Sequence, residues 1–280
     1  MNIRHLLRAG ILLGVLVGSP TQADVLVLVH GWSANADTWL RNGVIAPLAA
    51  RGWVDAGVMI AGPQGTTYLP AYSNNTQRTI YRAQLTAEAP LHVQATQLQA
   101  ELRMIRQQHP NEPITLAGHS SGGIVARLAL VHPQTPAVQA LITLGSPNLG
   151  TVRAIQGLDI AESKPFFCPG PGVDFVKRVA GGDDYRYLRA SRGALYDLQP
   201  VHYGSLIDWL NHQPHPDIAY YGVIRGGPSG HGDELVPAGS QDLNQVPALQ
   251  GRVNVLVVPT SHGLEPRDGV LIADILEGRR

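Results

Sequence analysis

The stretch PITLAGHSSGGIVARLAL, residues 113–130, decides the fold. Its apolar beginning predicts a buried strand, and its end predicts a helix. Between them GHSSG, residues 118–122, fits the pattern G-x-S-x-G, which presents a serine hydroxyl on a sharp strand-to-helix turn. Such a turn leaves room for only small residues at Gly118 and Gly122. The stretch therefore predicts Ser120 as a nucleophile; the alternative is an ordinary turn in which a serine caps the helix.

A serine hydroxyl becomes a nucleophile only when a base takes its proton, and the base needs an acid to orient it. After this kind of turn the expected chain order is serine, acid, histidine. Asp233 lies in GHGDELVP, after an apolar run at 218–225, and His262 lies in PTSHGLEP, after another run at 252–258. Because both loops follow parallel strands, we expect Asp233 and His262 to meet Ser120 at one edge of the sheet.

Other acids and histidines fit these roles less well. Glu234 is adjacent to Asp233 but should point elsewhere, and His231 is expected to be a solvated loop residue. His119 lies inside the turn and cannot reach back to its neighbour. The histidines at 202, 212 and 215 lie in a segment without strands.

Two backbone N–H groups are candidates for stabilising a developing oxyanion. Ser121 begins the helix, where N–H groups have no partner within the helix. Trp32 follows the apolar run DVLVLV (24–29) and a glycine, so its N–H can turn toward the same point. For His30 we expect only hydrogen bonds to nearby backbone.

Alternating apolar runs and helical patterns predict an α/β fold, a mostly parallel sheet covered by helices on both faces. The region 62–89 reads as polar loop. Residues 150–216 hold no clear strand and predict a cap or lid insertion over Ser120, in which at least one of Phe166, Phe167 and Trp209 contacts the acyl chain. The alternative is a fixed cap with no part in selectivity. The predicted strands are 24–29, 54–61, 114–118, 138–145, 218–225 and 252–258.

The first 23 residues have a basic start, a short apolar middle and small residues before Ala23, which predicts a secretory signal peptide and a domain at 24–280. A membrane anchor is the alternative. This signal predicts a periplasmic or secreted protein. Cys168 is the single cysteine, so no intramolecular disulfide can form, and its role stays open. The net charge of zero and the absence of like-charge runs disfavour nucleic-acid binding.

The motifs VLVHGW, LAGHSSGG, LGSPNLGT, GDELVP and SHG resemble, in order, the α/β-hydrolase superfamily, and within it the bacterial lipases and esterases. The resemblance implies Ser120 as nucleophile, Asp233 as acid, His262 as base, and the N–H groups of Trp32 and Ser121 as oxyanion hole. It implies no cofactor and an acyl ester or lipid as substrate, with transient contact with a lipid interface left open. This chain has Asn148 where the group often has a histidine.

Some secreted members of that group bind calcium. Around His262 only Glu265 and Asp268 are available as extra acids, so we predict no metal. The expected reaction is hydrolysis of carboxylic esters through an acyl-enzyme. A thioesterase or acyltransferase with the same three residues is the alternative, and a non-catalytic protein on a hydrolase fold is a second. A metallohydrolase is disfavoured because no H-E-x-x-H pattern occurs.

Overall fold

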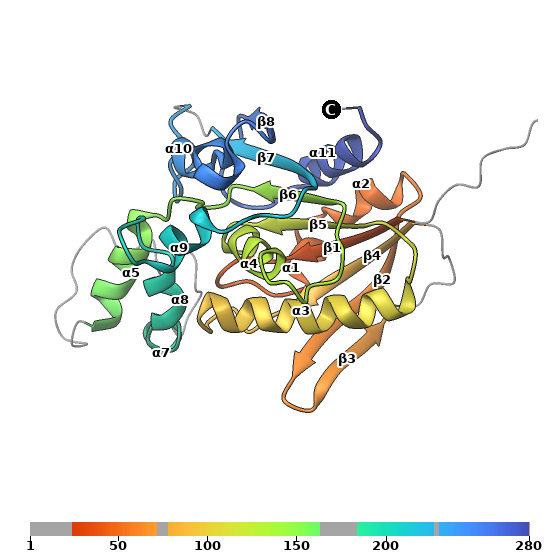
Figure 1. Cartoon of the computed structure of the whole chain (residues 1–280), viewed down its shortest axis with the longest axis horizontal. Helices are drawn as coiled ribbons and strands as arrows, with labels where there is room; N and C mark the ends of the chain where they lie inside the picture. The colour runs from red at the N-terminus through yellow and green to blue at the C-terminus, as the bar shows by residue number, and fades with distance from the viewer. Residues whose placement is uncertain (1–23, 72–77, 163–183, 227–229, 280) are drawn as a thin grey trace, which may run out of the picture.

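The centre of the molecule is an eight-stranded sheet with the order β3-β2-β4-β1-β5-β6-β7-β8 (Figure 1). The computed structural model describes residues 24–71, 78–162, 184–226 and 230–279. All neighbouring strands are parallel except β2 and β3, which form an antiparallel hairpin. The mostly parallel α/β sheet predicted from the sequence is confirmed. The strands are β1 Asp24–Val29, β2 Val54–Gly62, β3 Gly65–Pro70, β4 Arg78–Gln84, β5 Ile114–His119, β6 Ala140–Leu144, β7 Ala219–Arg225 and β8 Val253–Val258.

The central strand β1 explains why its sequence is apolar without alternation. Val25 and Val27 belong to the core on one face of the sheet, whereas Leu26 and Leu28 belong to the core on the other face. All four side chains are buried. In a strand that is buried on both sides, apolar surface is removed from water at every position, so both faces of the strand contribute to stability.

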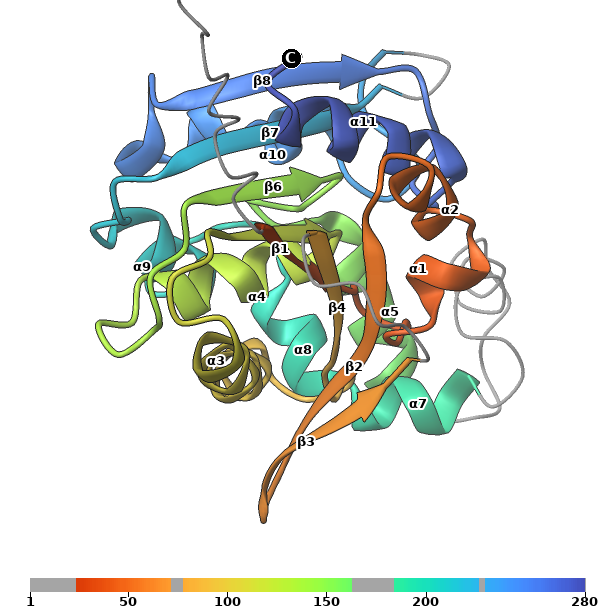
Figure 2. The ribbon, with the colours of Figure 1, turned by 90° about the vertical axis from the view of Figure 1, so that its right-hand side faces the viewer.

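Helices cover both faces of the sheet (Figures 1 and 2). On one face lie α3 (Leu91–Gln108) and α4 (Ser121–Leu130), whose apolar sides pack on the valines of β1. On the other face lie α1 (Thr38–Arg41), α2 (Ile45–Ala49) and α11 (Pro266–Leu276). Short helices fill the connection between β7 and β8: α10 (Ala238–Gln241) and the 3-10 turns Leu243–Gln245 and Pro247–Leu249. No helix in the described part of the chain is long and apolar enough to cross a membrane.

The prediction of loop at 62–89 is wrong, because this region contains β3 and β4. The sequence of β4, RTIYRAQ, looks polar, yet its five middle residues are buried. The Arg82 guanidinium contacts the carboxylates of Asp55 and Asp37, and the Tyr81 hydroxyl contacts Gln108 and His109. These partners offset the cost of burying polar side chains, and the sequence pattern does not show them.

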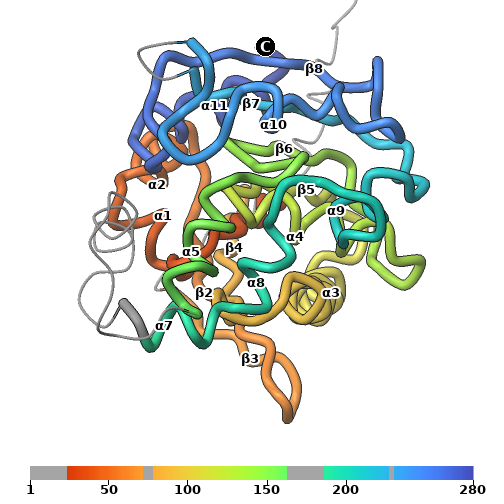
Figure 3. The backbone as a smooth tube through the Cα atoms, turned by 90° about the vertical axis from the view of Figure 1, so that its left-hand side faces the viewer, coloured from red at the N-terminus to blue at the C-terminus, as the bar shows by residue number. Residues whose placement is uncertain are grey.

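The segment after β6 contains α5 (Val152–Glu162), α7 (Asp184–Ala190), α8 (Arg192–Asp197) and α9 (Leu206–His212). Figure 3 looks at the edge where the parallel strands end, and there α5, α7 and α8 lie together, whereas α9 lies to one side near α3. Residues 163–183, with Phe166, Phe167 and Cys168, are outside the described residues, as are residues 1–23.

Candidate active site

Ser120 occupies the turn between β5 and α4 in a backbone conformation that serine rarely adopts, with φ 54° and ψ −131°. The glycines around it are required by close contacts. A Cβ on Gly118 would lie 2.6 Å from the Cα of Gly123, and one on Gly122 would lie 2.4 Å from the carbonyl oxygen of His30. The turn therefore forces the Ser120 side chain out at the end of β5, where the neighbouring strands also end.

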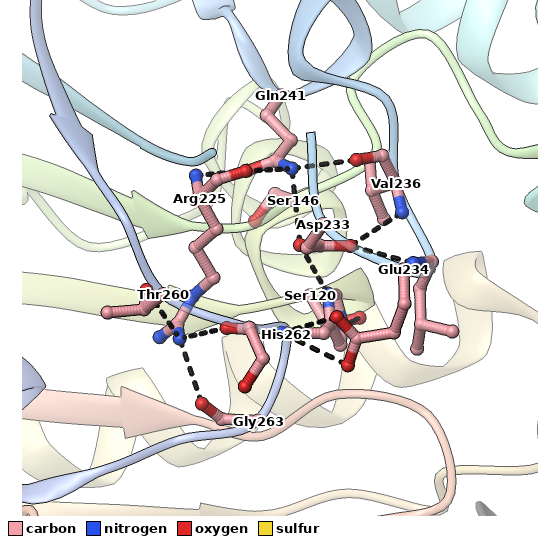
Figure 4. Close-up of polar contacts among 12 residues, drawn as sticks. Ser120, Ser146, Arg225, Asp233, Glu234, Val236, Gln241, Thr260, His262 and Gly263 are labelled. Atoms are coloured by element: carbon pink, nitrogen blue, oxygen red, sulfur yellow. Dashed lines mark hydrogen bonds and ion pairs between the residues drawn. The ribbon is translucent and has the colours of Figure 1, made fainter. Parts of the chain in front are cut away.

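Three side chains from separate loops form one chain of hydrogen bonds (Figure 4). His262 Nε2 lies 2.9 Å from Ser120 Oγ, and His262 Nδ1 lies 2.8 Å from Asp233 Oδ2. Asp233 follows β7 and His262 follows β8, so two strand ends bring them to Ser120. The structure thus brings together the three residues that the sequence predicts as nucleophile, acid and base.

The carboxylate of Asp233 is fully shielded from water and is held by further donors. Its Oδ1 accepts hydrogen bonds from the N–H groups of Leu235 (2.8 Å) and Val236 (2.7 Å). Its Oδ2 also accepts one from the Gln241 side chain at 3.2 Å. These donors fix the orientation of the carboxylate, so that Oδ2 faces the ring of His262.

At the expected oxyanion site, Trp32 N–H donates a hydrogen bond to the Ser121 hydroxyl, with a nitrogen–oxygen distance of 2.7 Å. The loop that carries Trp32 packs directly on the nucleophile, since a Cβ on Gly31 would lie 2.8 Å from the Cβ of Ser120. The hydroxyl of Ser121 is a feature that the sequence analysis missed, because it considered only the backbone of that residue. Its side chain and the two predicted N–H groups meet beside Ser120.

His30 has the structural role expected for it. Its Nε2 accepts a hydrogen bond from the N–H of Leu85 at 3.1 Å, and its Nδ1 lies 2.9 Å from the carbonyl oxygen of Gly31. Burial lowers the pKa of His30, which favours the neutral ring that this pair of contacts requires.

Two residues that the sequence analysis set aside contact the main chain of His262. His119 Nε2 lies 2.8 Å from the carbonyl oxygen of His262, and the Glu234 carboxylate accepts a hydrogen bond from His262 N–H at 3.1 Å. Burial, followed by the proximity of His262 and Arg225, holds the pKa of His119 well below its usual range. His119 is therefore a neutral N–H donor. No spacing in the sequence indicates these contacts, because they depend on how two loops meet.

Beside Ser120 and His262 opens a cavity of about 500 Å³, including its mouth. Its walls are mostly aliphatic and come from α5, α8 and the loop after Asp233; Ala154, Gly157, Leu195 and Leu198 are among them. The prediction that Trp209 belongs to this surface is wrong. Trp209 is half exposed and lines a different groove, between α3, α4 and α9. In sequence Trp209 is close to α8, but α9 lies beside α4.

Within the described residues, no group of three or more His, Cys, Asp or Glu side chains could hold a metal ion. Asp268, one of the two acids considered for calcium, instead pairs with the Arg225 guanidinium at 2.7 Å.

The sheet order, the turn at Ser120 and the loops that follow β7 and β8 define an α/β-hydrolase fold. Residues 68–161 match the family model described as the PGAP1-like alpha/beta domain. No curated protein sequence matches the chain.

Several solved structures resemble the molecule at low sequence identity. The mature lipase BlEst2 from Bacillus licheniformis has a TM-score of 0.61 and 19% identity, covering 95% of each chain. The product of gene lin2722 from Listeria innocua has a TM-score of 0.60 and 15% identity, covering 91% of this chain and 94% of that one. The esterase RhEst1 from Rhodococcus sp. ECU1013 has a TM-score of 0.53 and 15% identity, covering 91% and 90%. These similarities confirm the fold.

Proposed function

We propose that this protein is a serine hydrolase that cleaves carboxylic esters of apolar acids through an acyl-enzyme. The observation that carries the proposal is the unbroken series of hydrogen bonds from Ser120 through His262 to Asp233, at the mouth of an aliphatic cavity. A non-catalytic protein on this fold would have no need of all three residues in that geometry.

In the proposed reaction, Ser120 Oγ attacks the acyl carbonyl carbon while its proton moves to His262 Nε2. Asp233 accepts the hydrogen bond from His262 Nδ1–H and stabilises the imidazolium that forms. The negative charge on the former carbonyl oxygen is stabilised by donors at Trp32 and Ser121. His262 then gives its proton to the leaving alcohol as the carbon–oxygen bond breaks. Water, deprotonated by His262, attacks the acyl-enzyme, and the acid leaves as Ser120 regains its proton.

The cavity supports an acyl group of aliphatic character. Its walls include Gly157, Leu195 and Leu198. Each methylene group of an acyl chain that is buried against them stabilises the bound substrate by about 0.8 kcal/mol. A charged acyl group would lose its hydration against these aliphatic walls, which disfavours its binding there.

The test is a panel of nitrophenyl esters of increasing acyl length, assayed with wild type and Ser120→Ala. We expect wild type to hydrolyse esters and to react with a fluorophosphonate probe, and Ser120→Ala to lose both, with activity reduced by about 10⁴-fold or more. Turnover or labelling that survives in Ser120→Ala would reject Ser120 as the nucleophile.

A thioesterase or acyltransferase is the second candidate, because the same three residues serve any acyl leaving group or acceptor. An acyl-thioester assayed beside the esters, with and without an alcohol acceptor, distinguishes these activities. Faster turnover of the thioester, or acyl transfer in preference to hydrolysis, would favour the second candidate.

We further propose that residues 1–23 direct export, so that the enzyme acts in the periplasm or outside the cell. The basic start and short apolar run of this segment support the proposal. Fractionation of cells that produce the full chain, with N-terminal sequencing of the exported product, tests it. An exported product that begins at Asp24 is expected, whereas a chain retained in the cytoplasm with Met1 intact would contradict it.

A further inference from the structure

The base of the proposed reaction lies in a short irregular turn. His262 is in the connection between the end of β8 at Val258 and the start of α11 at Pro266, where no helix or strand hydrogen bonds hold the chain. A general base must nevertheless lie within hydrogen-bond reach of its proton. Other parts of the molecule must therefore hold this turn in place.

The side chain of Arg225, the last residue of β7, holds the turn on both sides of His262 (Figure 4). Its Nη1 donates hydrogen bonds to the carbonyl oxygens of Ser261 and Gly263, each at 2.8 Å. The carbonyl oxygen of His262 itself accepts a hydrogen bond from the His119 ring. Three consecutive carbonyl groups are thus fixed by two side chains, from the ends of the two strands on either side of β6.

Arg225 is itself rigidly held. Its guanidinium is fully buried, and its Nη2 donates to Asp268 Oδ1 at 2.7 Å. The second oxygen of Asp268 accepts the N–H of Glu265, in the capping box that starts α11. Gln241 accepts the Arg225 backbone N–H at 2.7 Å and also donates to Asp233. One connected network therefore joins the proposed acid, the turn of the proposed base and the start of the last helix.

Burying a charged pair has a large desolvation cost, so such a pair is poor evidence for stability alone. Here the guanidinium also donates hydrogen bonds to two carbonyl groups of the turn, so its contacts extend beyond the ion pair. The planar guanidinium has several N–H donors in fixed directions, so it can bond the carbonyl groups and Asp268 at the same time. A lysine ammonium has one nitrogen and cannot make the same set of hydrogen bonds. Among the described residues, the ionisable side chains at the turn are Asp233 and Glu234 in the acid loop, His119 on β5, Arg225 on β7, Asp268 on α11 and Glu265 at the N-cap of α11.

We propose that Arg225 is a positioning residue for the reaction: paired with Asp268, its guanidinium clamps the carbonyl groups on both sides of His262 and keeps the imidazole aligned between Ser120 and Asp233. The proposal rests on the proposed function, because it assigns His262 as the base.

The test uses Arg225→Lys, which keeps a positive charge opposite Asp268 but cannot make this set of hydrogen bonds. We expect kcat to fall by about 10²-fold with little change in KM, because a base displaced by about 1 Å loses this much. The rate at which a fluorophosphonate labels Ser120 should fall by a similar factor to kcat. The low-field proton resonance of His262 Nδ1–H, measured without substrate, should broaden or disappear.

The matched control is Arg127→Lys. Arg127 is as fully buried as Arg225, but it contacts Asn148, Asn211 and His215 instead of the His262 turn. Arg127→Lys should lower the melting temperature and leave kcat and the His262 resonance as in wild type. Equal losses of kcat in both variants, a loss in KM alone, or wild-type kcat and resonance in Arg225→Lys would overturn the proposal.

Should Arg225→Lys fail to fold, Asp268→Asn provides the second variant, because its amide oxygen can still accept the N–H of Glu265. It should lower kcat in the same direction, and an unchanged kcat would overturn the proposal. If wild type hydrolyses no ester and is not labelled by a fluorophosphonate, the proposed function is rejected. Comparison of the His262 resonance in wild type and Arg225→Lys still shows whether Arg225 positions His262.

Discussion

At the scale of single residues, Ser121 brings two different groups to the site. Its N–H is at the first position of α4, and its hydroxyl accepts the N–H of Trp32. Since the hydroxyl oxygen is the acceptor in that contact, its own hydrogen is available to donate. The side chain can therefore hold the Trp32 loop against the nucleophile and supply a donor to the oxyanion.

Replacing Ser121 by Ala should lower kcat by about 10²-fold, as expected for the loss of one donor at an oxyanion, with little change in KM. Ester hydrolysis over a range of substrate concentrations measures both. Ser146→Ala is the control: Ser146 is equally buried, and among the described residues its hydroxyl has no hydrogen-bond partner. If Ser121→Ala and Ser146→Ala are equally active, the hydroxyl of Ser121 has no part in the reaction.

Asp233→Asn should reduce kcat by about 10⁴-fold, because an amide cannot stabilise the imidazolium and favours the wrong tautomer of His262. Glu234→Gln should cost much less, roughly tenfold, since its amide oxygen still accepts the backbone N–H of His262 and only the charge is lost. Steady-state kinetics of the two variants side by side check this. A larger loss in Glu234→Gln would move the acid by one residue.

At the scale of elements, α5 decides how much room lies beyond Ser120. Gly157 faces the cavity from this helix, and a Cβ there would lie 3.2 Å from the side chain of Leu195 on α8. The small residues Ala154 and Gly157 therefore let α5 lie close to α8 where both helices border the cavity.

Gly157→Leu should fill part of the cavity and shift the preference of the enzyme toward shorter acyl chains. The ratio of kcat/KM for short and long nitrophenyl esters measures the shift, which we expect to reach roughly 10-fold or more, as for a few methylene groups. Asp159→Leu adds the same side chain to the exposed side of α5 and should leave the ratio unchanged. The same ratio in all three proteins would mean that the acyl chain binds elsewhere.

At the scale of the whole molecule, the sequence predicted what local patterns encode. The runs that became β1, β5 and β8 are apolar and bounded by glycine or proline, and the glycines around Ser120 are required by the turn itself. It did not predict β4, whose buried arginine and tyrosine are satisfied by distant partners.

The roles of Arg225 and His119 were missed for the same reason. Both contact the His262 turn only after the folded sheet has brought the ends of β5, β7 and β8 to the same edge. Such contacts cannot be predicted from spacing along one chain, whereas the meeting of Ser120, Asp233 and His262 could be predicted from their places after successive strands.

The buried histidines of the folded protein make its stability depend on pH. Burial, and then the charge of Arg127, lower the pKa of His215 to about 4, from an ordinary value near 6.5. Its Nε2 accepts a hydrogen bond from Arg127 Nε at 3.3 Å, a contact that protonation would abolish. The lowered pKa of His119 acts in the same direction.

Below about pH 6.5 the unfolded chain binds a proton at His215, whereas the folded protein binds this proton only near pH 4. The free energy of unfolding should therefore fall as the pH falls from about 6.5 to about 4, and then level off. Two and a half pKa units correspond to about 3 kcal/mol from this one residue. His215→Gln, whose amide oxygen can accept the same bond from Arg127, should flatten the decline, whereas His202→Gln at an exposed position should not. Urea unfolding between pH 4 and 8 measures the three curves. A decline as steep in His215→Gln as in wild type would show that His215 does not bind the destabilising proton.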